Sequence, residues 1–127
     1  LMSAKKGFKT VLCPGHKTYF DMAYNSSTYE RGICWAATIE VKEVFEWKPV
    51  KGYSSNDLEN ILGIQAQLWS ETITNKNYFD EMINPRLAAL AEIAWSSEAK
   101  RSWANFRSSL KNNLKYLSKI GWKFHNF

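Results

Sequence analysis

Two short clusters of aromatic and carboxylate side chains could hold a polar ligand. Tyr19 and Asp21 lie in the segment YFDMAY, and Trp69 and Glu71 end the segment ILGIQAQLWSE. Carboxylates accept hydrogen bonds from hydroxyl groups, and the face of an indole packs on the apolar face of a pyranose ring. These residue types therefore indicate a carbohydrate. Composition alone favours a plainer interpretation, in which Trp69 is a core residue and Glu71 a solvated acid.

Each cluster follows a β-prone run, GFKTVLCPG over residues 7–15 and ILGIQAQLW over residues 61–69. Neither run alternates cleanly between apolar and polar residues, which is typical of strands that are covered on both faces in a parallel sheet. In α/β folds of this kind, functional residues gather at the carboxyl ends of the strands. If the two strands are parallel neighbours, both clusters share one rim.

Helices account for most of the remaining sequence. A long loop over residues 19–35 leads to a predicted short helix over residues 36–47, where Ile39, Val44 and Trp47 have loosely helical spacing. Residues 48–57, KPVKGYSSND, are predicted to form a loop. The order of strand, loop, helix, strand and further helices is βα alternation, and it predicts the α/β class.

After Glu71 the pattern is helical, with a break at Pro85. We expect Pro85 in the first turn of a helix, with Asn84 as its cap. The residues predicted to share the apolar face of this helix are Leu87, Leu90, Ala91, Ala94 and Trp95. A last helix repeats the pattern with Trp103, Phe106, Leu110, Leu114 and Leu117. Gly121 is predicted to cap it.

Bulk composition narrows the class of protein. The 127 residues suit one domain, and 45% hydrophobic with 15% aromatic residues is a globular composition. The net charge of +5 comes from scattered basic residues, which favours solvated helix faces over a nucleic-acid surface. No apolar run approaches the roughly 20 residues of a membrane span. We therefore expect neither nucleic acid nor membrane as a partner, and the compartment stays open.

The metal-ligating residue types are sparse. Cys13 and Cys34 lack the spacing of a metal site, and His16 and His125 are isolated, so we expect no metal and no cofactor. The two cysteines form either one disulfide or two free thiols. The tryptophans outside the two clusters are expected to be packing residues: Trp35, Trp47, Trp95, Trp103 and Trp122. Of these, Trp35 differs from the others in lying in a predicted loop.

Longer segments resemble a known family. LGIQAQLWSE followed by PRLAALAEIAWS is similar to the C-terminal end of the catalytic barrel of glycoside hydrolase family 20, the β-N-acetylhexosaminidases. YFDMAY, ICWAATIEVKEVFEWKP and SWANFRSSLKNNLKYLSKIGW resemble other segments of that barrel, in the same order. The resemblance implies a partial (β/α)8 TIM barrel, with residues 7–14 and 61–69 as its seventh and eighth strands. Residues 1–127 would be the C-terminal segment of the barrel.

The resemblance also implies roles for individual residues. Tyr19 would hydrogen-bond the acetamido carbonyl of an N-acetylhexosamine, a catalytic role that helps the acetamido group attack the anomeric carbon and form an oxazoline-like intermediate. Asp21 would bind sugar hydroxyls, and Glu71 the O4 side of the sugar. Trp69 would wall the acetamido pocket, and Trp35 would border the site. The expected partner is a glycan that contains N-acetylhexosamine.

The chain lacks the sequence motif that carries the catalytic general acid in this family. The family's general acid is the glutamate of an Asp-Glu pair in an H-x-G-G-D-E setting, whereas Asp80 and Glu81 lie in helix-like sequence without the glycines. The first-strand arginine and the earlier pocket tryptophans of the family are also absent. General acid catalysis contributes about 10²–10⁴-fold to rate.

We therefore expect a C-terminal fragment of a β-N-acetylhexosaminidase that is inactive alone. The parent would remove terminal N-acetylglucosamine or N-acetylgalactosamine by substrate-assisted retaining catalysis. The alternative is a non-catalytic carbohydrate-binding or interaction module.

Two strands of an eight-stranded barrel leave sheet edges and apolar faces open. The side chains concerned are Val11, Leu12, Ile64 and Leu68. We expect the chain to form a homo-oligomer or to associate with the missing N-terminal part of the barrel. The alternative is a monomer in which the two C-terminal helices cover the sheet.

Overall fold

The fold is mixed α/β, as the computed structural model shows for residues 2–29 and 31–127. Two strands, β1 (Thr10–Leu12) and β2 (Ile61–Ile64), form a parallel sheet. Thr10 pairs with Ile61 and Leu12 with Ile64, which confirms the predicted parallel neighbours. Both strands are shorter than predicted. Pro14 begins the turn that ends the first strand, because its ring offers no N–H to a sheet ladder.

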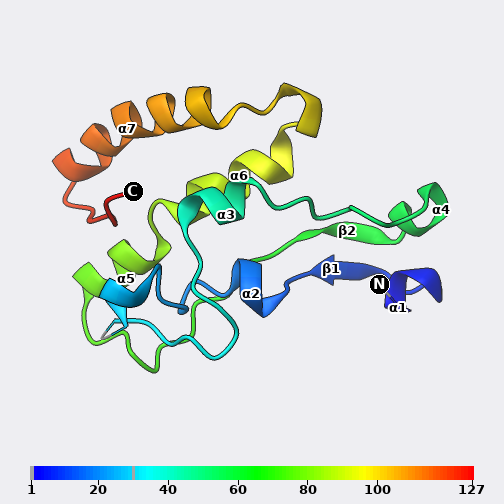
Figure 1. The fold of residues 1–127 in the computed structure, drawn as a ribbon, viewed down its shortest axis with the longest axis horizontal. Helices are drawn as coiled ribbons and strands as arrows, with labels where there is room; N and C mark the ends of the chain where they lie inside the picture. The colour runs from blue at the N-terminus through cyan, green and yellow to red at the C-terminus, as the bar shows by residue number, and fades with distance from the viewer. Residues whose placement is uncertain (1, 30) are drawn as a thin grey trace.

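Helices precede, connect and follow the two strands. They are α1 (Met2–Lys5), α2 (Gly15–Thr18), α3 (Val41–Phe45), α4 (Ser55–Leu58), α5 (Lys76–Ile83), α6 (Arg86–Trp95) and α7 (Trp103–Lys119), with 3-10 turns η1 (Ser26–Thr28) and η2 (Glu98–Lys100). In Figure 1 the strands run out to one side with α1 and α4 at their far end, and α5, α6 and α7 lie toward the other side. No helix in the described ranges is both long and apolar enough to cross a membrane.

The helix predicted over residues 36–47 is reduced to α3. Glu40 and Glu43 form a capping box that begins this helix. The preceding Ile39 stays non-helical because its N–H donates to Ala23 O at 2.9 Å. Ile39 and Val44 are buried and Trp47 is half-buried against the core, as predicted. The loop predicted over residues 48–57 is wrong in part, because α4 begins within it.

The prediction for α6 is wrong about its cap and about most of its face, of which Leu90 alone is buried as predicted. Asn84 ends α5, and its side-chain amide donates toward Lys123 O at 3.5 Å instead of capping α6. Pro85 takes the N-cap position, so the first helical residue is Arg86. The buried residues of α6 are Arg86, Ala89, Leu90 and Ile93, whereas Leu87, Ala91, Ala94 and Trp95 are exposed. Hydrogen bonds of the Arg86 side chain fix the helix with this face inward.

The last helix follows the predicted pattern. The apolar stripe of α7 packs on the core through Leu110 and Leu114, which are buried. Its first turn rests on α3, where the ring of Phe106 stacks on that of Phe45 with a centroid distance of 4.8 Å. Gly121 has φ +86° just after the helix, and the N–H of Trp122 donates to Leu117 O, as in a Schellman cap.

A close approach of two segments positions the loop that carries the first cluster. Ala23 donates its N–H to Ile33 O at 2.7 Å, and Met22 and Ile33 form a parallel bridge. Gly32 permits this contact, because a Cβ there would lie 2.5 Å from the nitrogen of Ala23. The residues around Asp21 are thereby packed between the sheet and the loop over residues 31–39.

Candidate functional site

Tyr19 lies between two exposed indole rings. Its ring centroid is 6.1 Å from that of Trp35, at an interplanar angle of 80°, and 6.5 Å from that of Trp69, at 61°. Trp35 is 70% exposed and Trp69 is 51% exposed. These are edge-to-face contacts, the favoured geometry of aromatic pairs. The three rings therefore form an open aromatic surface, and Trp35 belongs to it although composition indicated a packing residue.

The backbone explains why these rings meet. Tyr19 ends α2, where its N–H donates to Gly15 O, and it forms a parallel bridge with Gln67. Phe20 donates its N–H to Gln67 O at 2.7 Å, and Gln67 donates to Thr18 O at 3.0 Å. This ladder continues the pairing of the two strands beyond their ends. The two predicted clusters consequently share one rim.

Asp21 connects the two clusters directly. Its Oδ1 accepts the backbone N–H of Trp69 at 3.3 Å, and its Oδ2 has no hydrogen-bond partner within the described residues. The side chain is 1% exposed, and burial raises the pKa of the Asp21 carboxyl. The negative charge of Glu71 raises that pKa further, whereas the charge of Arg86 lowers it.

Glu71 lies in the exposed turn after Trp69, near enough for its charge to act on Asp21. Direct contacts thus join four of the predicted residues, namely Tyr19, Asp21, Trp35 and Trp69. Glu71 lies close enough for its charge to raise the pKa of Asp21. Their combined surface offers carboxylate acceptors beside apolar ring faces. That arrangement suits a ring-shaped ligand with hydroxyl groups.

Comparisons with known proteins identify the family of the chain. The family pattern described as Glycosyl hydrolase family 20, catalytic domain, matches residues 1–98. The chain is 32% identical over 123 residues to a beta-N-acetylhexosaminidase of Cellulomonas fimi, with 97% of this chain covered. It superimposes on a solved exo-beta-N-acetylglucosaminidase of Vibrio harveyi with a TM-score of 0.90, at 34% identity over 97% of this chain.

The chain belongs to glycoside hydrolase family 20. It spans about a quarter of the length of the relatives it matches, 25% of the Cellulomonas protein and 20% of the Vibrio structure. The Vibrio protein has also been solved in complex with N-acetylglucosamine, and that structure matches with a TM-score of 0.86, 31% identity and coverage of 97% of this chain and 20% of that one.

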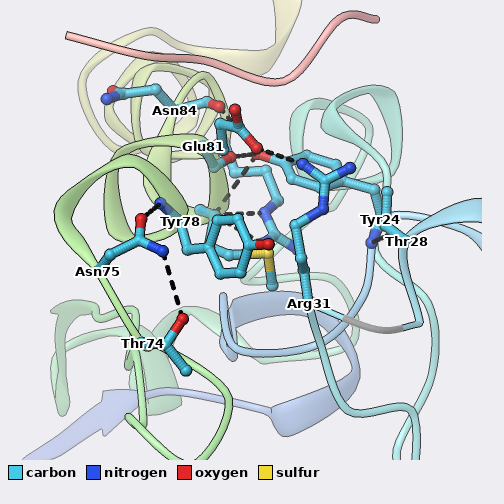
Figure 2. Close-up of polar contacts among 10 residues, drawn as sticks. Tyr24, Thr28, Arg31, Thr74, Asn75, Tyr78, Glu81 and Asn84 are labelled. Atoms are coloured by element: carbon cyan, nitrogen blue, oxygen red, sulfur yellow. Dashed lines mark hydrogen bonds and ion pairs between the residues drawn. The ribbon is translucent and has the colours of Figure 1, made fainter.

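The Asp-Glu dipeptide of this family 20 chain is engaged in structural contacts on α5. Asp80 is buried, pairs with Lys76 and accepts the backbone N–H of Lys123. Glu81 pairs with Arg31, whose guanidinium also lies 5.7 Å from the ring centroid of Tyr78. Figure 2 shows this pair joining the loop of Arg31 to α5. These contacts fasten the loop that leads to Trp35.

One residue that organises the site was missed by the sequence analysis. Arg86 is fully buried, and its guanidinium donates to the carbonyl oxygens of Phe20 and Met22, on either side of Asp21. The signal available in the sequence was an arginine in an otherwise apolar stretch, PRLAALAEIAW. A cation in such a stretch requires buried partners.

The remaining candidates for metal or redox chemistry stay apart. Cys13 and Cys34 are exposed free thiols, so of the two predicted alternatives the structure has two free thiols and not a disulfide. In the part of the chain that the structure describes, no cluster of histidine, cysteine and carboxylate side chains could hold a metal ion. Of the tryptophans expected to pack, Trp47 and Trp103 are half-buried against the core, whereas Trp95 and Trp122 are exposed, at 91% and 36%, and contradict the prediction.

Proposed function

We propose that the chain forms the part of a family 20 catalytic domain that carries one wall of an N-acetylhexosamine site. In this proposal the domain is a (β/α)8 barrel, and β1 and β2 are its seventh and eighth strands. The observation that carries it is Tyr19 between Trp35 and Trp69, with Asp21 bonded to the backbone of Trp69. The complex of the Vibrio harveyi relative with N-acetylglucosamine supports this class of ligand.

The proposed chemistry assigns each side chain a task. The Tyr19 hydroxyl donates to the acetamido carbonyl oxygen and holds it behind the anomeric carbon. That oxygen forms a bond to the anomeric carbon as the glycosidic bond breaks, and water then opens the oxazoline-like intermediate with retention of configuration. Trp35 and Trp69 confine the acetamido group and the sugar ring. Asp21 and Glu71 accept hydrogen bonds from the sugar hydroxyls.

The complete domain would hydrolyse terminal N-acetylglucosamine or N-acetylgalactosamine, and this chain alone would not. Protonation of the leaving oxygen needs a general acid in the site. Asp80 is buried on α5 and Glu81 is paired with Arg31, so neither side chain is free for that task. We therefore place the acid in another part of the domain. Incubation of the chain with a chromogenic N-acetylglucosaminide should give no turnover, and robust activity that survives purification would refute this assignment.

Binding is tested by an NMR titration of the labelled chain with N-acetylglucosamine at millimolar concentration. We expect the indole N–H signals of Trp35 and Trp69 to shift, and the Trp69→Ala variant to lose binding. The matched control is Trp95→Ala, which removes another exposed indole from the outer side of α6. Binding that Trp95→Ala weakens as much as Trp69→Ala does would contradict the proposal. So would the absence of any shift at either site tryptophan.

The second candidate is a non-catalytic carbohydrate-binding module. It is favoured by one observation, namely that the aromatic surface is already assembled within this chain. Co-expression with the remaining part of a family 20 barrel separates the two functions. Restored hydrolysis supports the catalytic domain, whereas sugar binding without restored hydrolysis supports the binding module.

A further inference from the structure

Arg86 contacts the segment that carries the site through main-chain carbonyls and through the rings of Phe20 and Tyr24. Its Nη2 donates to Phe20 O at 2.5 Å and its Nη1 to Met22 O at 2.8 Å, so the guanidinium holds the carbonyl on each side of Asp21. Nε and Nη2 also donate to Met82 O, at 3.1 and 2.6 Å, which ties the same group to α5. One planar side chain thereby joins α5, α6 and the segment of Asp21.

These bonds determine which way Asp21 faces. The carbonyl of Asp21 itself accepts the N–H of Ile33 at 3.0 Å, whereas the carbonyls before and after it accept from Arg86. Successive groups of an extended segment point to opposite sides. With both sides of the backbone held, the Asp21 side chain is left to meet the N–H of Trp69.

The guanidinium is also fixed by aromatic rings and acts on Asp21 by its charge. Its central carbon lies 3.8 Å from the ring centroid of Tyr24 and 5.1 Å from that of Phe20. Such cation–π contacts hold a buried arginine in one plane. The positive charge lowers the pKa of the Asp21 carboxyl and so opposes the effect of burial.

We propose that Arg86 is a positioning residue of the sugar site, which fixes the Tyr19–Asp21 segment against Trp69 without contacting the sugar. The inference rests on the proposed function and extends it to a residue behind the site. Lysine would keep the charge, but a single ammonium group lacks the planar fork that spans several carbonyls. Arg86→Lys therefore separates the geometry from the charge.

The test compares Arg86→Lys with Ile93→Ala in the full 127-residue chain. Ile93 is buried on the same helix, so its truncation destabilises α6 without removing a bond to the Asp21 segment. By NMR titration at low temperature, we expect the affinity for N-acetylglucosamine to fall on the order of tenfold in Arg86→Lys and to change less than about twofold in Ile93→Ala. The Trp69 amide should shift upfield and exchange faster with solvent in Arg86→Lys only.

The NMR signal of the Trp69 amide reports its hydrogen bond to Asp21 even when no sugar is present. The role of Arg86 can therefore be tested independently of the proposed sugar site. If the unaltered chain binds no sugar, the proposed function fails while this signal still tests Arg86. Unchanged affinity and an unchanged Trp69 amide in folded Arg86→Lys would overturn the positioning role. Equal losses of affinity in Arg86→Lys and Ile93→Ala would also overturn it, because Arg86 would then act only through the stability of the fold.

A measurement on the unaltered chain covers the case in which Arg86→Lys does not fold. Native-state hydrogen exchange in low urea follows the guanidinium protons of Arg86 and the amide of Trp69. We expect both groups to lose protection at the same urea concentration. Protection of the Trp69 amide that outlasts that of Arg86 would overturn the proposal.

Discussion

Large apolar side chains face solvent in one region of the molecule and are fully covered in another. The strand arm, which we define as residues 2–12 and 54–64, leaves Leu62 66% exposed and Val11 41% exposed. Around Arg86, by contrast, Phe20, Met22 and Ile39 are buried by α3, α5 and α6 of the same chain. Figure 1 shows the arm running away from these helices. The region around Arg86 is therefore covered by helices of the same chain, whereas the arm leaves large apolar side chains exposed.

The open surface of the arm agrees with the proposal that β1 and β2 belong to a larger barrel. Apolar side chains and sheet edges of this kind are normally covered by another strand or another chain. Of the four side chains expected to be open, only Val11 is exposed; Leu12, Ile64 and Leu68 are half-buried, and Ile64 and Leu68 pack against the core. Leu62, which was not among them, is exposed as well. Self-association, or association with the remaining part of a barrel, thus stays a prediction.

The largest effect is expected from truncations that compare the two regions. Ile39→Ala removes a fully buried side chain, and we expect it to lower the free energy of unfolding by about 2–5 kcal/mol. Leu62→Ala makes a similar truncation at an exposed position and, at a concentration too low for self-association, should cost less than about 0.5 kcal/mol. Urea denaturation measures both values. A cost for Leu62→Ala close to that of Ile39→Ala would show that the arm is buried in solution.

A charge placed on the arm tests whether this surface pairs with a second copy. We expect the unaltered chain to self-associate at micromolar concentration in light scattering. Leu62→Lys should weaken that association about tenfold, or about 1.4 kcal/mol, because pairing would bury the ammonium group. The control is Leu87→Lys on the exposed side of α6. A monomeric unaltered chain, or dissociation caused by Leu87→Lys alone, would contradict the role of the arm.

The ion pair that fastens the Trp35 loop should have a smaller effect. Arg31 and Glu81 are both partly buried, whereas the pair of Lys42 and Glu46 is more than half exposed. We expect Glu81→Gln to lower the free energy of unfolding by roughly 1 kcal/mol and Glu46→Gln to have an effect near zero. Thermal unfolding of the two variants measures the difference. Equal effects would mean that Arg31 and Glu81 add nothing beyond a surface pair.

The shared rim could be predicted because its signals are local. Pro14 and Gly15 after one β-prone run and Trp69 to Glu71 after the other are enough to place both clusters at strand ends. Parallel pairing then brings the clusters together, and the bridge of Tyr19 with Gln67 confirms it. The last helix was equally readable, since its apolar residues recur with a helical period and Gly121 follows them.

The orientation of α6 could not be read in this way. Amphipathic spacing placed Trp95 inside, but the buried face is set by Arg86, which donates to carbonyls of Phe20, Met22 and Ile39, all more than 40 positions earlier in the chain, as well as to that of Met82. Backbone acceptors leave no trace in side-chain patterns. A second long-range bond keeps Ile39 outside α3, because its N–H donates to the carbonyl of Ala23, two residues after Asp21. Long-range hydrogen bonds overrode local preference at both places.

The smallest expected effect concerns pH at the C-terminal tail, which packs on the region around Arg86. The imidazole of His125 stacks on the ring of Tyr24 with a centroid distance of 3.8 Å and an interplanar angle of 14°. Burial lowers the pKa of His125; the charges of Arg86 and Arg31 lower it as well, and those of Glu40 and Glu81 oppose the change. The folded chain thus binds its proton less readily than the unfolded chain does.

The stabilising contribution of neutral His125 is therefore complete above about pH 6.5 and is lost as the pH falls toward the lower folded value. Asp21 acts in the opposite sense, because its raised pKa penalises the ionised form and the penalty is relieved on protonation at lower pH. We expect unfolding free energies measured by urea denaturation to decline slightly below pH 6.5. At more acidic pH the gain from Asp21 is opposed by Asp57 and Glu98, because hydrogen bonds lower the pKa values of these two carboxyls and that stabilisation is lost on protonation. His125→Gln should remove the first decline, whereas His16→Gln, at an exposed position, should keep it. If the decline of the unfolding free energy persists in His125→Gln, another titrating group causes it. Protonation of the C-terminal tail would then not affect the stability of the region around Arg86.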